Sequence, residues 1–140
     1  MKETLQDLLF HCIDMTMLLK HCHWNVKGVG FRPLHEFLDD IYSTVDDIRD
    51  DIAERMVMLQ YPANGLSEDV VRNSDLATLP VEFIGTAEVI SEMESRLEQL
   101  VKKFNEAVKS TNGDDPVTSN MLQDMTHQLE KHLWMLRHSK

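Results

Sequence analysis

Apolar residues recur every three or four positions over long stretches of the chain, with polar residues between them. This spacing is typical of amphipathic helices, which bury one face and expose the other. It predicts a first helix from about Glu3 to Val26 and a second one with Pro33 in its first turn, where proline is well tolerated. The second helix ends before Tyr61, and its apolar stripe comprises Leu34, Leu38, Ile41, Val45, Ile48, Ile52, Met56 and Leu59.

The second half of the chain repeats this pattern after an irregular connection. Ser67, followed by two acidic residues, is expected to cap a short helix, and Pro80 closes the connection. The third helix has a stripe of Phe83, Ala87, Ile90, Met93, Leu97, Leu100, Phe104 and Val108. Asp115-Pro116 favours the start of a fourth helix, because Asp is a preferred N-cap and Pro fits the first helical position. The fourth stripe comprises Met121, Leu122, Met125, Leu129, Leu133 and Leu136.

Four long helices and a short one between the second and third predict an all-α, four-helix bundle. The length of 140 residues supports one domain, residues 1–140, with one core. Five Gly and four Pro supply little turn material, which argues against an all-β fold.

Charge and cysteine content narrow the class of protein. Acidic residues outnumber basic ones by 24 to 14, and a net charge of -10 disfavours sequence-independent binding to nucleic acid. No apolar run approaches the roughly 20 residues of a membrane span, and the polar start Met1–Thr4 is not a signal peptide. Cys12 and Cys22 lack metal-site spacing and are interpreted as buried, reduced thiols, so we expect a cytoplasmic protein.

Imidazoles and carboxylates concentrate in the first two helices. His35 and Asp39 are four positions apart and therefore neighbours on one helix face, and Asp50 and Glu54 repeat that spacing. The four lie in one stripe at the border of the apolar face, where unpaired carboxylates are costly. A divalent iron, manganese or zinc ion would explain them. The alternative is that they are solvated acids of a surface helix.

One helix cannot wrap both pairs around a single ion. Asp39 and Asp50 lie roughly 16 Å apart along the helix axis. The two pairs nevertheless share a midpoint, since 35 and 54 average to 44.5, as do 39 and 50. Two antiparallel copies of the helix would set His35 and Asp39 of one copy against Glu54 and Asp50 of the other. Such a twofold contact creates two equivalent sites.

These residues carry a resemblance to the Dps family, the mini-ferritins of the ferritin-like superfamily. The signature comprises His23-Trp24-Asn25-Val26-Lys27-Gly28, Phe31, Leu34-His35-Glu36, Asp39 and Asp50-Asp51-Ile52-Ala53-Glu54-Arg55. The first 60 residues match it specifically, and the remainder matches in layout, including Trp134 near the end. The resemblance implies a ferroxidase centre with His23, His35 and Asp39 from one subunit and Asp50 and Glu54 from its partner.

The resemblance also implies what the protein does. Its centre would bind Fe(II), oxidise it with hydrogen peroxide or more slowly with dioxygen, and pass Fe(III) to a mineral core. The expected assembly is a hollow shell of twelve subunits that protects its host from oxidative stress. Trp24 has two interpretations, a side chain beside the centre that intercepts a stray oxidising equivalent or a core aromatic at a helix end.

Other polar residues have less specific interpretations. Asp114 and Asp115 would line threefold pores through which iron enters, by the same resemblance, although helix capping alone explains Asp115. His21 lies two positions from His23 and points to a different face. The remaining histidines are expected at the surface or in the core, namely His11, His127, His132 and His138.

The sequence argues against three other functions. A di-iron site inside one bundle needs Glu-x-x-His on two helices, and that motif is absent from the sequence. Direct DNA binding is not expected, because a single Lys stands among the first four residues and the net charge is strongly negative. A bundle that serves only as an interaction module would show no iron oxidation.

Overall fold

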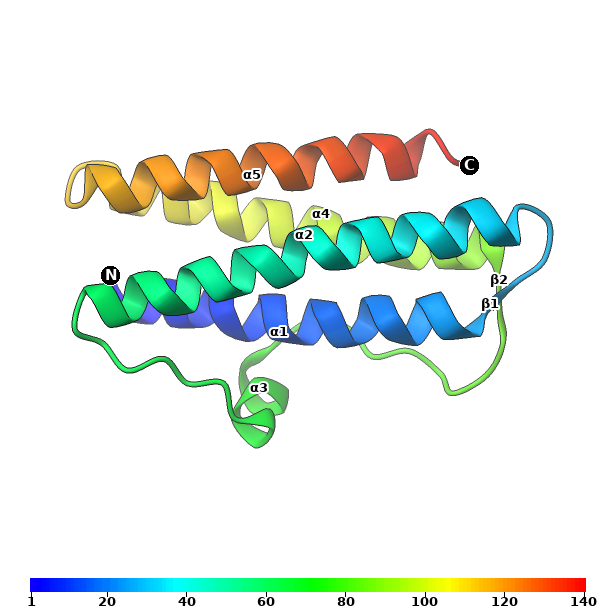
Figure 1. The fold of residues 1–140 in the computed structure, drawn as a ribbon, viewed down its shortest axis with the longest axis horizontal. Coiled ribbons are helices and arrows are strands. Elements are labelled where there is room, and N and C mark those ends of the chain that lie inside the picture. Colours follow the sequence, from blue (N-terminus) through cyan, green and yellow to red (C-terminus); the bar gives the residue numbers. More distant parts are fainter.

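Four long helices share one long axis in a computed structural model that describes residues 1–140 (Figure 1). They are α1 (Lys2–Asn25), α2 (Phe31–Met58), α4 (Thr86–Thr111) and α5 (Pro116–Arg137). A short helix, α3 (Ser67–Asn73), packs outside the bundle against α1. The all-α bundle with a short helix in the middle connection is confirmed.

Two helical hairpins make up the bundle. The α1–α2 hairpin and the α4–α5 hairpin pack side by side, and a long crossover connects the end of α2 to the start of α4 (Figure 1). Because the crossover returns along the length of the bundle, α2 and α4 run in the same direction. Two very short strands, β1 (Val26–Lys27) and β2 (Ile84–Gly85), pair in parallel and join the two hairpins at one end.

The core lies between the two hairpins and consists of 31 buried apolar residues. The apolar stripe of α2 is buried from Leu34 to Met56, as its spacing predicts. Both cysteines are buried and free, and the Cys22 Sγ lies 3.7 Å from the Met93 Sδ. No helix is long and apolar enough to cross a membrane.

The start of the third long helix differs from the prediction. Phe83 and Ala87 are exposed, and the helix begins only at Thr86. The reason is that Ile84 and Gly85 pair with β1 as extended backbone, which the helical spacing of the apolar residues cannot reveal. Ser67 is also not a cap, since it is the first residue of α3 and makes no capping hydrogen bond.

The start of the fourth long helix agrees with the prediction. The Asp115 Oδ1 accepts a hydrogen bond of 3.1 Å from the backbone N–H of Thr118, and Pro116 follows it in the first helical position. Asp115 is therefore an N-cap that satisfies one of the free N–H groups of the first turn.

Candidate metal centre

Two histidines stack at the end of the bundle where α1 meets α2. Their ring centroids are 3.7 Å apart and the rings are 12° from parallel. The His23 Nδ1 lies 2.7 Å from the backbone oxygen of His35, and the His35 Nδ1 lies 2.7 Å from the backbone oxygen of His23. Because a carbonyl oxygen can only accept, both Nδ1 atoms carry a hydrogen, and neither Nε2 atom has a hydrogen-bond partner. This is the form in which a neutral imidazole binds a metal.

The turn between the two helices sets up this pair. Gly28 and Gly30 have φ values of 116° and 77°, which residues other than glycine rarely adopt. These two glycines let the chain reverse direction over a few residues. His23 in the last turn of α1 consequently faces His35 at the start of α2. Phe31 stacks on the His35 ring at 5.0 Å between centroids and covers that side of the pair.

Asp39 lies one turn beyond His35 and is held by a lysine of α1. The Lys20 ammonium donates to the Asp39 Oδ1, and the exposed fractions of the two side chains are 28% and 46%. This hydrogen bond is the main reason why the pKa of Asp39 lies below its ordinary value, although desolvation opposes the shift. Asp39 is therefore ionised, and it lines one open groove together with His23 and His35.

Asp50 and Glu54 lie in the other half of α2 and are exposed. No Lys, Arg or His lies within salt-bridge distance of either carboxylate. Hydrogen bonding and charge from Asp50 raise the pKa of Glu54 above its ordinary value, because two neighbouring carboxylates resist ionising together. The expectation that these acids border a buried face is wrong for the single chain, in which they face solvent.

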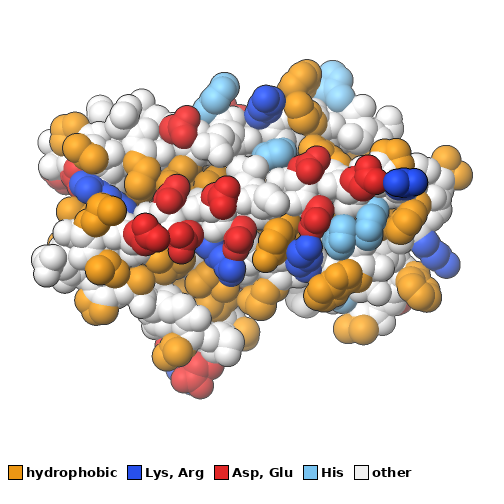
Figure 2. Space-filling view, in the orientation of Figure 1, with side chains coloured by type: hydrophobic (Ala, Val, Ile, Leu, Met, Phe, Trp, Pro, Cys, Tyr) orange, Lys and Arg blue, Asp and Glu red, His pale blue; other side chains and the backbone are white.

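His23, His35 and Asp39 thus line one groove, whereas Asp50 and Glu54 lie in the other half of α2. No three His, Cys, Asp or Glu side chains in the chain are close enough to hold a metal ion. Figure 2 shows a row of acidic side chains along α2, with histidines beside the row near the end where α2 begins. The predicted ligands on α2 therefore form two separate groups, and His23 of α1 lies beside the first of them.

Trp24 is not a core aromatic, because 69% of its surface is exposed. The other predicted residues have structural partners or lie at the surface. His21 lies with its Nε2 2.8 Å from the backbone oxygen of Pro80. His11 is buried, with its Nε2 2.8 Å from the Asp75 Oδ1.

Asp115 is a poor candidate for a pore residue that attracts cations. Its carboxylate accepts hydrogen bonds from Thr118 and from the Arg55 Nη2 at 3.0 Å. These bonds, with those to Thr118 as the largest cause, lower the pKa of Asp115 to about 2. The charge of Asp115 is already compensated within the chain, whereas Asp114 is exposed.

Lys20 and Tyr42 are the residues of this region that sequence reasoning missed. The Lys20 Nζ lies 4.5 Å from the centroid of the Tyr42 ring, so that one ammonium contacts both Tyr42 and Asp39. Both could have been found from the helical spacing, because residues three positions apart are neighbours on a helix. Lys20 lies three positions before His23, and Tyr42 lies three positions after Asp39.

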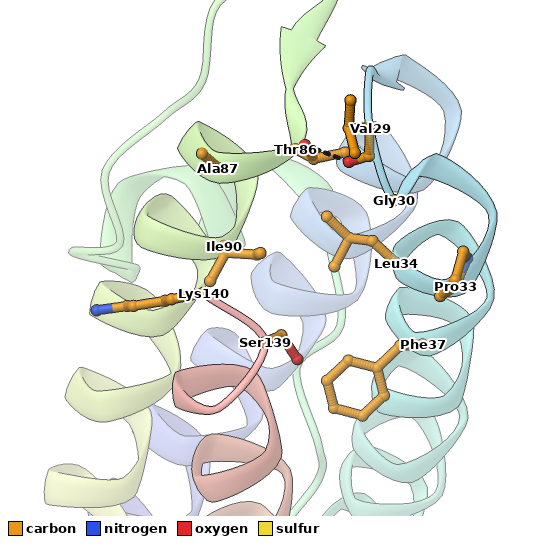
Figure 3. A pocket seen from close by; sticks show the side chains of 10 residues that line it. All are labelled: Val29, Gly30, Pro33, Leu34, Phe37, Thr86, Ala87, Ile90, Ser139 and Lys140. Carbon is orange, nitrogen blue, oxygen red and sulfur yellow. Dashed lines mark hydrogen bonds between the residues drawn. The ribbon is translucent and has the colours of Figure 1, made fainter.

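A separate cavity of about 500 Å³ lies at the same end of the bundle, between α2, α4 and the C-terminus (Figure 3). Leu34, Phe37 and Ile90 point into the cavity. At its rim, the Thr86 hydroxyl donates a hydrogen bond of 2.8 Å to the backbone oxygen of Val29. The cavity has no carboxylate or imidazole in its lining, so it offers no metal ligands.

Comparisons with known proteins agree with this architecture. The model of the ferritin-like domain family matches residues 2–139. DNA protection during starvation protein 2 of Deinococcus radiodurans is 31% identical over 135 residues, which are 96% of this chain and 56% of that protein. The chain therefore spans little more than half of that relative. DNA protection during starvation protein of Helicobacter pylori is 31% identical over 136 residues, 96% of this chain and 94% of that one.

The crystal structure of Dps92 from Deinococcus radiodurans superimposes with a TM-score of 0.95 at 31% identity, covering 98% of this chain and 83% of that chain. Fold, sequence and family model thus agree over nearly the whole length of the chain. The chain belongs to the Dps family of the ferritin-like superfamily.

Proposed function

We propose that the protein is a mini-ferritin that oxidises Fe(II) to Fe(III), preferably with hydrogen peroxide, and stores the ferric mineral in a hollow shell. Fe(II) is its substrate and cargo. Each ferroxidase centre takes His23, His35 and Asp39 from one subunit and Asp50 and Glu54 from its partner. This activity removes iron and peroxide together and so protects against oxidative stress.

The observation that supports this proposal most is the division of the donor set between the two ends of α2. One end has two free imidazole Nε2 atoms beside an ionised carboxylate, and the other has two carboxylates with no basic partner. A twofold axis near residues 44 and 45 brings opposite ends together across an isologous contact. Dps-family proteins are typically dodecameric, and a shell of twelve contains such twofold pairs.

The chemistry of these groups suits iron oxidation. Carboxylates are hard ligands that bind Fe(III) more strongly than Fe(II), so they favour loss of an electron. Imidazole nitrogens bind iron as well, and His23 and His35 are already held in the required tautomer. Five ligands shared among bound irons leave coordination positions open for the oxidant.

Mixing two inactive variants tests whether the centre is shared. One variant carries His35→Ala with Asp39→Ala, and the other carries Asp50→Ala with Glu54→Ala. Alone, each should oxidise Fe(II) with peroxide scarcely faster than buffer, because every centre lacks two ligands. In a mixed pair, one centre has lost all four residues and the other is intact. Random pairing makes about half of the pairs mixed, so co-assembly should restore about a quarter of the wild-type centres.

The same stopped-flow absorbance assay has two informative failures. Wild-type protein that does not accelerate Fe(II) oxidation would refute the ferroxidase function. Wild-type activity without recovery in co-assembled shells, with assembly checked by light scattering, would refute the shared centre and place it within one chain.

We further propose that DNA is not a direct partner and that any protection of DNA comes from the removal of iron. The supporting observation is the net charge of -10 per chain, which repels phosphate. Iron-free protein should leave plasmid DNA unshifted in a gel at low salt, and a salt-sensitive shift would contradict this.

A further inference from the structure

Asparagine followed by glycine occurs twice in the chain, at Asn64-Gly65 and at Asn112-Gly113. This dipeptide readily loses the asparagine side-chain amide, because glycine has no side chain to obstruct attack on that amide by the glycine backbone nitrogen. Neither pair belongs to the proposed iron centre. The fold surrounds the two pairs in different ways, so the same dipeptide should react at two different rates.

Asn64 is held by four hydrogen bonds in the connection between α2 and α3. Its Nδ2 donates to the Asp69 Oδ2 at 2.9 Å, and its Oδ1 accepts from the backbone N–H of Leu66 at 3.0 Å. Its backbone N–H and oxygen both bond the side-chain amide of Gln6, each at 2.9 Å. The side-chain amide of Asn64 therefore cannot turn towards the nitrogen of Gly65 unless its bonds to Asp69 and Leu66 break.

Asn112 is far less constrained, in the turn between α4 and α5. It follows the last residue of α4, and both Asn112 and Gly113 are exposed. Its side-chain amide makes no hydrogen bond within the chain, and the Gly113 N–H donates none. The turn is retained by the N–H groups of Asp114 and Asp115, which donate to the Thr111 oxygen at 3.2 and 2.9 Å. Attack requires rotation about the ψ angle of Asn112, which is -36°, and only this exposed turn has to open.

We propose that Asn112 deamidates spontaneously in the folded protein and that Asn64 is protected from the same reaction. The Gly113 nitrogen forms a bond to the Asn112 Cγ, and the side-chain nitrogen leaves as ammonia with the proton of the Gly113 N–H. Water then opens the resulting cyclic imide at either carbonyl. The products are aspartate and isoaspartate, in which the backbone runs through the side-chain carbon. This inference does not depend on the proposed ferroxidase function.

The modification changes the charge at the end of α4. A neutral amide becomes a carboxylate, so each converted chain gains one negative charge beyond its present -10. A negative charge at the C-terminal end of a helix opposes the helix dipole, and Asn112 is the C-cap of α4. The new carboxylate also lies two positions from the exposed Asp114. The α4–α5 turn should therefore become more acidic and less tightly closed as the protein ages.

Two matched substitutions can test the reaction without disturbing the fold. A Cβ added at Gly113 meets no heavy atom within 4 Å, and one added at Gly65 lies 3.9 Å from the Ile13 Cδ1. Neither glycine has a positive φ, so alanine fits both positions. Gly113→Ala should slow the deamidation of Asn112 several-fold, because the added methyl group obstructs the attack. Gly65→Ala is the control and should leave that rate unchanged.

Peptide mapping by mass spectrometry, after incubation of the iron-free protein at mildly alkaline pH, measures conversion at each asparagine. In the folded wild type, Asn112 should convert at least about tenfold faster than Asn64, because two side-chain hydrogen bonds hold Asn64. Asp69→Ala removes one of these bonds and should raise conversion of Asn64 several-fold, with Asn112 unaffected. In concentrated urea both sites should react at similar rates, because the fold no longer separates them.

Three results would overturn the proposal. One is an Asn112 that stays intact in the folded protein while it converts in urea. Another is equal conversion of Asn112 and Asn64 in the folded protein, which would mean that the hydrogen bonds of Asn64 give no protection. The third is a Gly113→Ala variant that converts at the wild-type rate, which would exclude attack by the Gly113 nitrogen.

Discussion

The two helical hairpins differ in how particular charged groups are satisfied. In the α4–α5 hairpin, Arg96 and Arg137 have partners within the chain. Arg96 is 3% exposed and donates to the backbone oxygens of Ala77 and Thr78, and Arg137 pairs with Glu94. In the α1–α2 hairpin, Asp50 and Glu54 face each other with no basic partner, and the two stacked imidazoles keep free Nε2 atoms.

This difference supports placing the proposed centre in the α1–α2 hairpin. A paired charge contributes to the stability of the fold that contains it. Like charges four positions apart on a helix destabilise that helix, so their presence calls for a cation or a partner that compensates them. The hairpin with unsatisfied groups is the one that carries the proposed centre, and substitutions in the two hairpins should have opposite consequences.

The largest effect is expected from Asp50→Asn combined with Glu54→Gln. Fe(II) oxidation should fall close to the rate without protein, because each centre loses two carboxylates. The melting temperature should stay the same or rise, since a like-charge contact is removed. Calorimetry on the iron-free protein checks this, with Glu94→Gln as the control that lowers the melting temperature and leaves oxidation intact. A clearly lower melting temperature of the double variant would contradict the difference drawn between the two hairpins.

Arg96→Met should be the most damaging change in the α4–α5 hairpin. It leaves the backbone oxygens of Ala77 and Thr78 without their donor in a buried place, at a cost of about 2–4 kcal/mol in the free energy of unfolding. Urea denaturation measures this loss. The partly exposed Arg137→Met should cost about 0–1 kcal/mol. The rate of Fe(II) oxidation per folded shell should be unchanged in both variants. A slower rate would show that the α4–α5 hairpin contributes to the proposed centre.

Asp115→Asn should produce a smaller loss that depends on pH. The pKa of Asp115 is about 2 in the folded chain, below its ordinary value of 3.8, so its charged form stabilises the fold. This contribution is fully present above about pH 4 and disappears as the pH falls through 2. The variant should therefore melt below the wild type at pH 7, with a gap that closes towards pH 2. Asp114→Asn, at an exposed neighbour, should show no gap at any pH.

Lys20→Met is expected to have the smallest effect. It frees Asp39 from its ammonium partner, so a metal ion no longer has to displace Lys20 from that carboxylate. Binding of Co(II), followed by its visible absorbance, should tighten about two- to fivefold, the range of a partly exposed ion pair. Unchanged or weaker binding would mean that Lys20 does not oppose metal binding.

Periodicity and capping residues predicted the elements that depend on local signals. The Asp115-Pro116 start and the α2 stripe needed only neighbouring residues, and the structure agrees with both. The pairing of Val26 with Ile84 could not be predicted, because it joins residues far apart in the sequence over a length of two residues. For the same reason Phe83 was misassigned to a helix.

The residues of the candidate centre are a prediction from the sequence, whereas the contacts that His23 and His35 make come from the structure alone. The spacing of His35 with Asp39 and of Asp50 with Glu54 identified the two halves. The exchange of hydrogen bonds between His23 and His35 requires the backbone path through the glycine turn, which no spacing rule describes. In the proposed function, a second chain brings the two groups of ligands together.

The burial of the two cysteines has a consequence for a protein that is proposed to handle peroxide. A thiolate reacts with oxidants far faster than a thiol does. Desolvation raises the pKa of Cys22 to about 11 and the pKa of Cys12 further still, so both stay protonated at neutral pH. Met93, in contact with Cys22, is equally sheltered, whereas Met17 and Met58 are about half exposed or more. Oxidative wear should therefore begin at these two surface thioethers and spare the sulfur atoms on which the packing of the bundle depends.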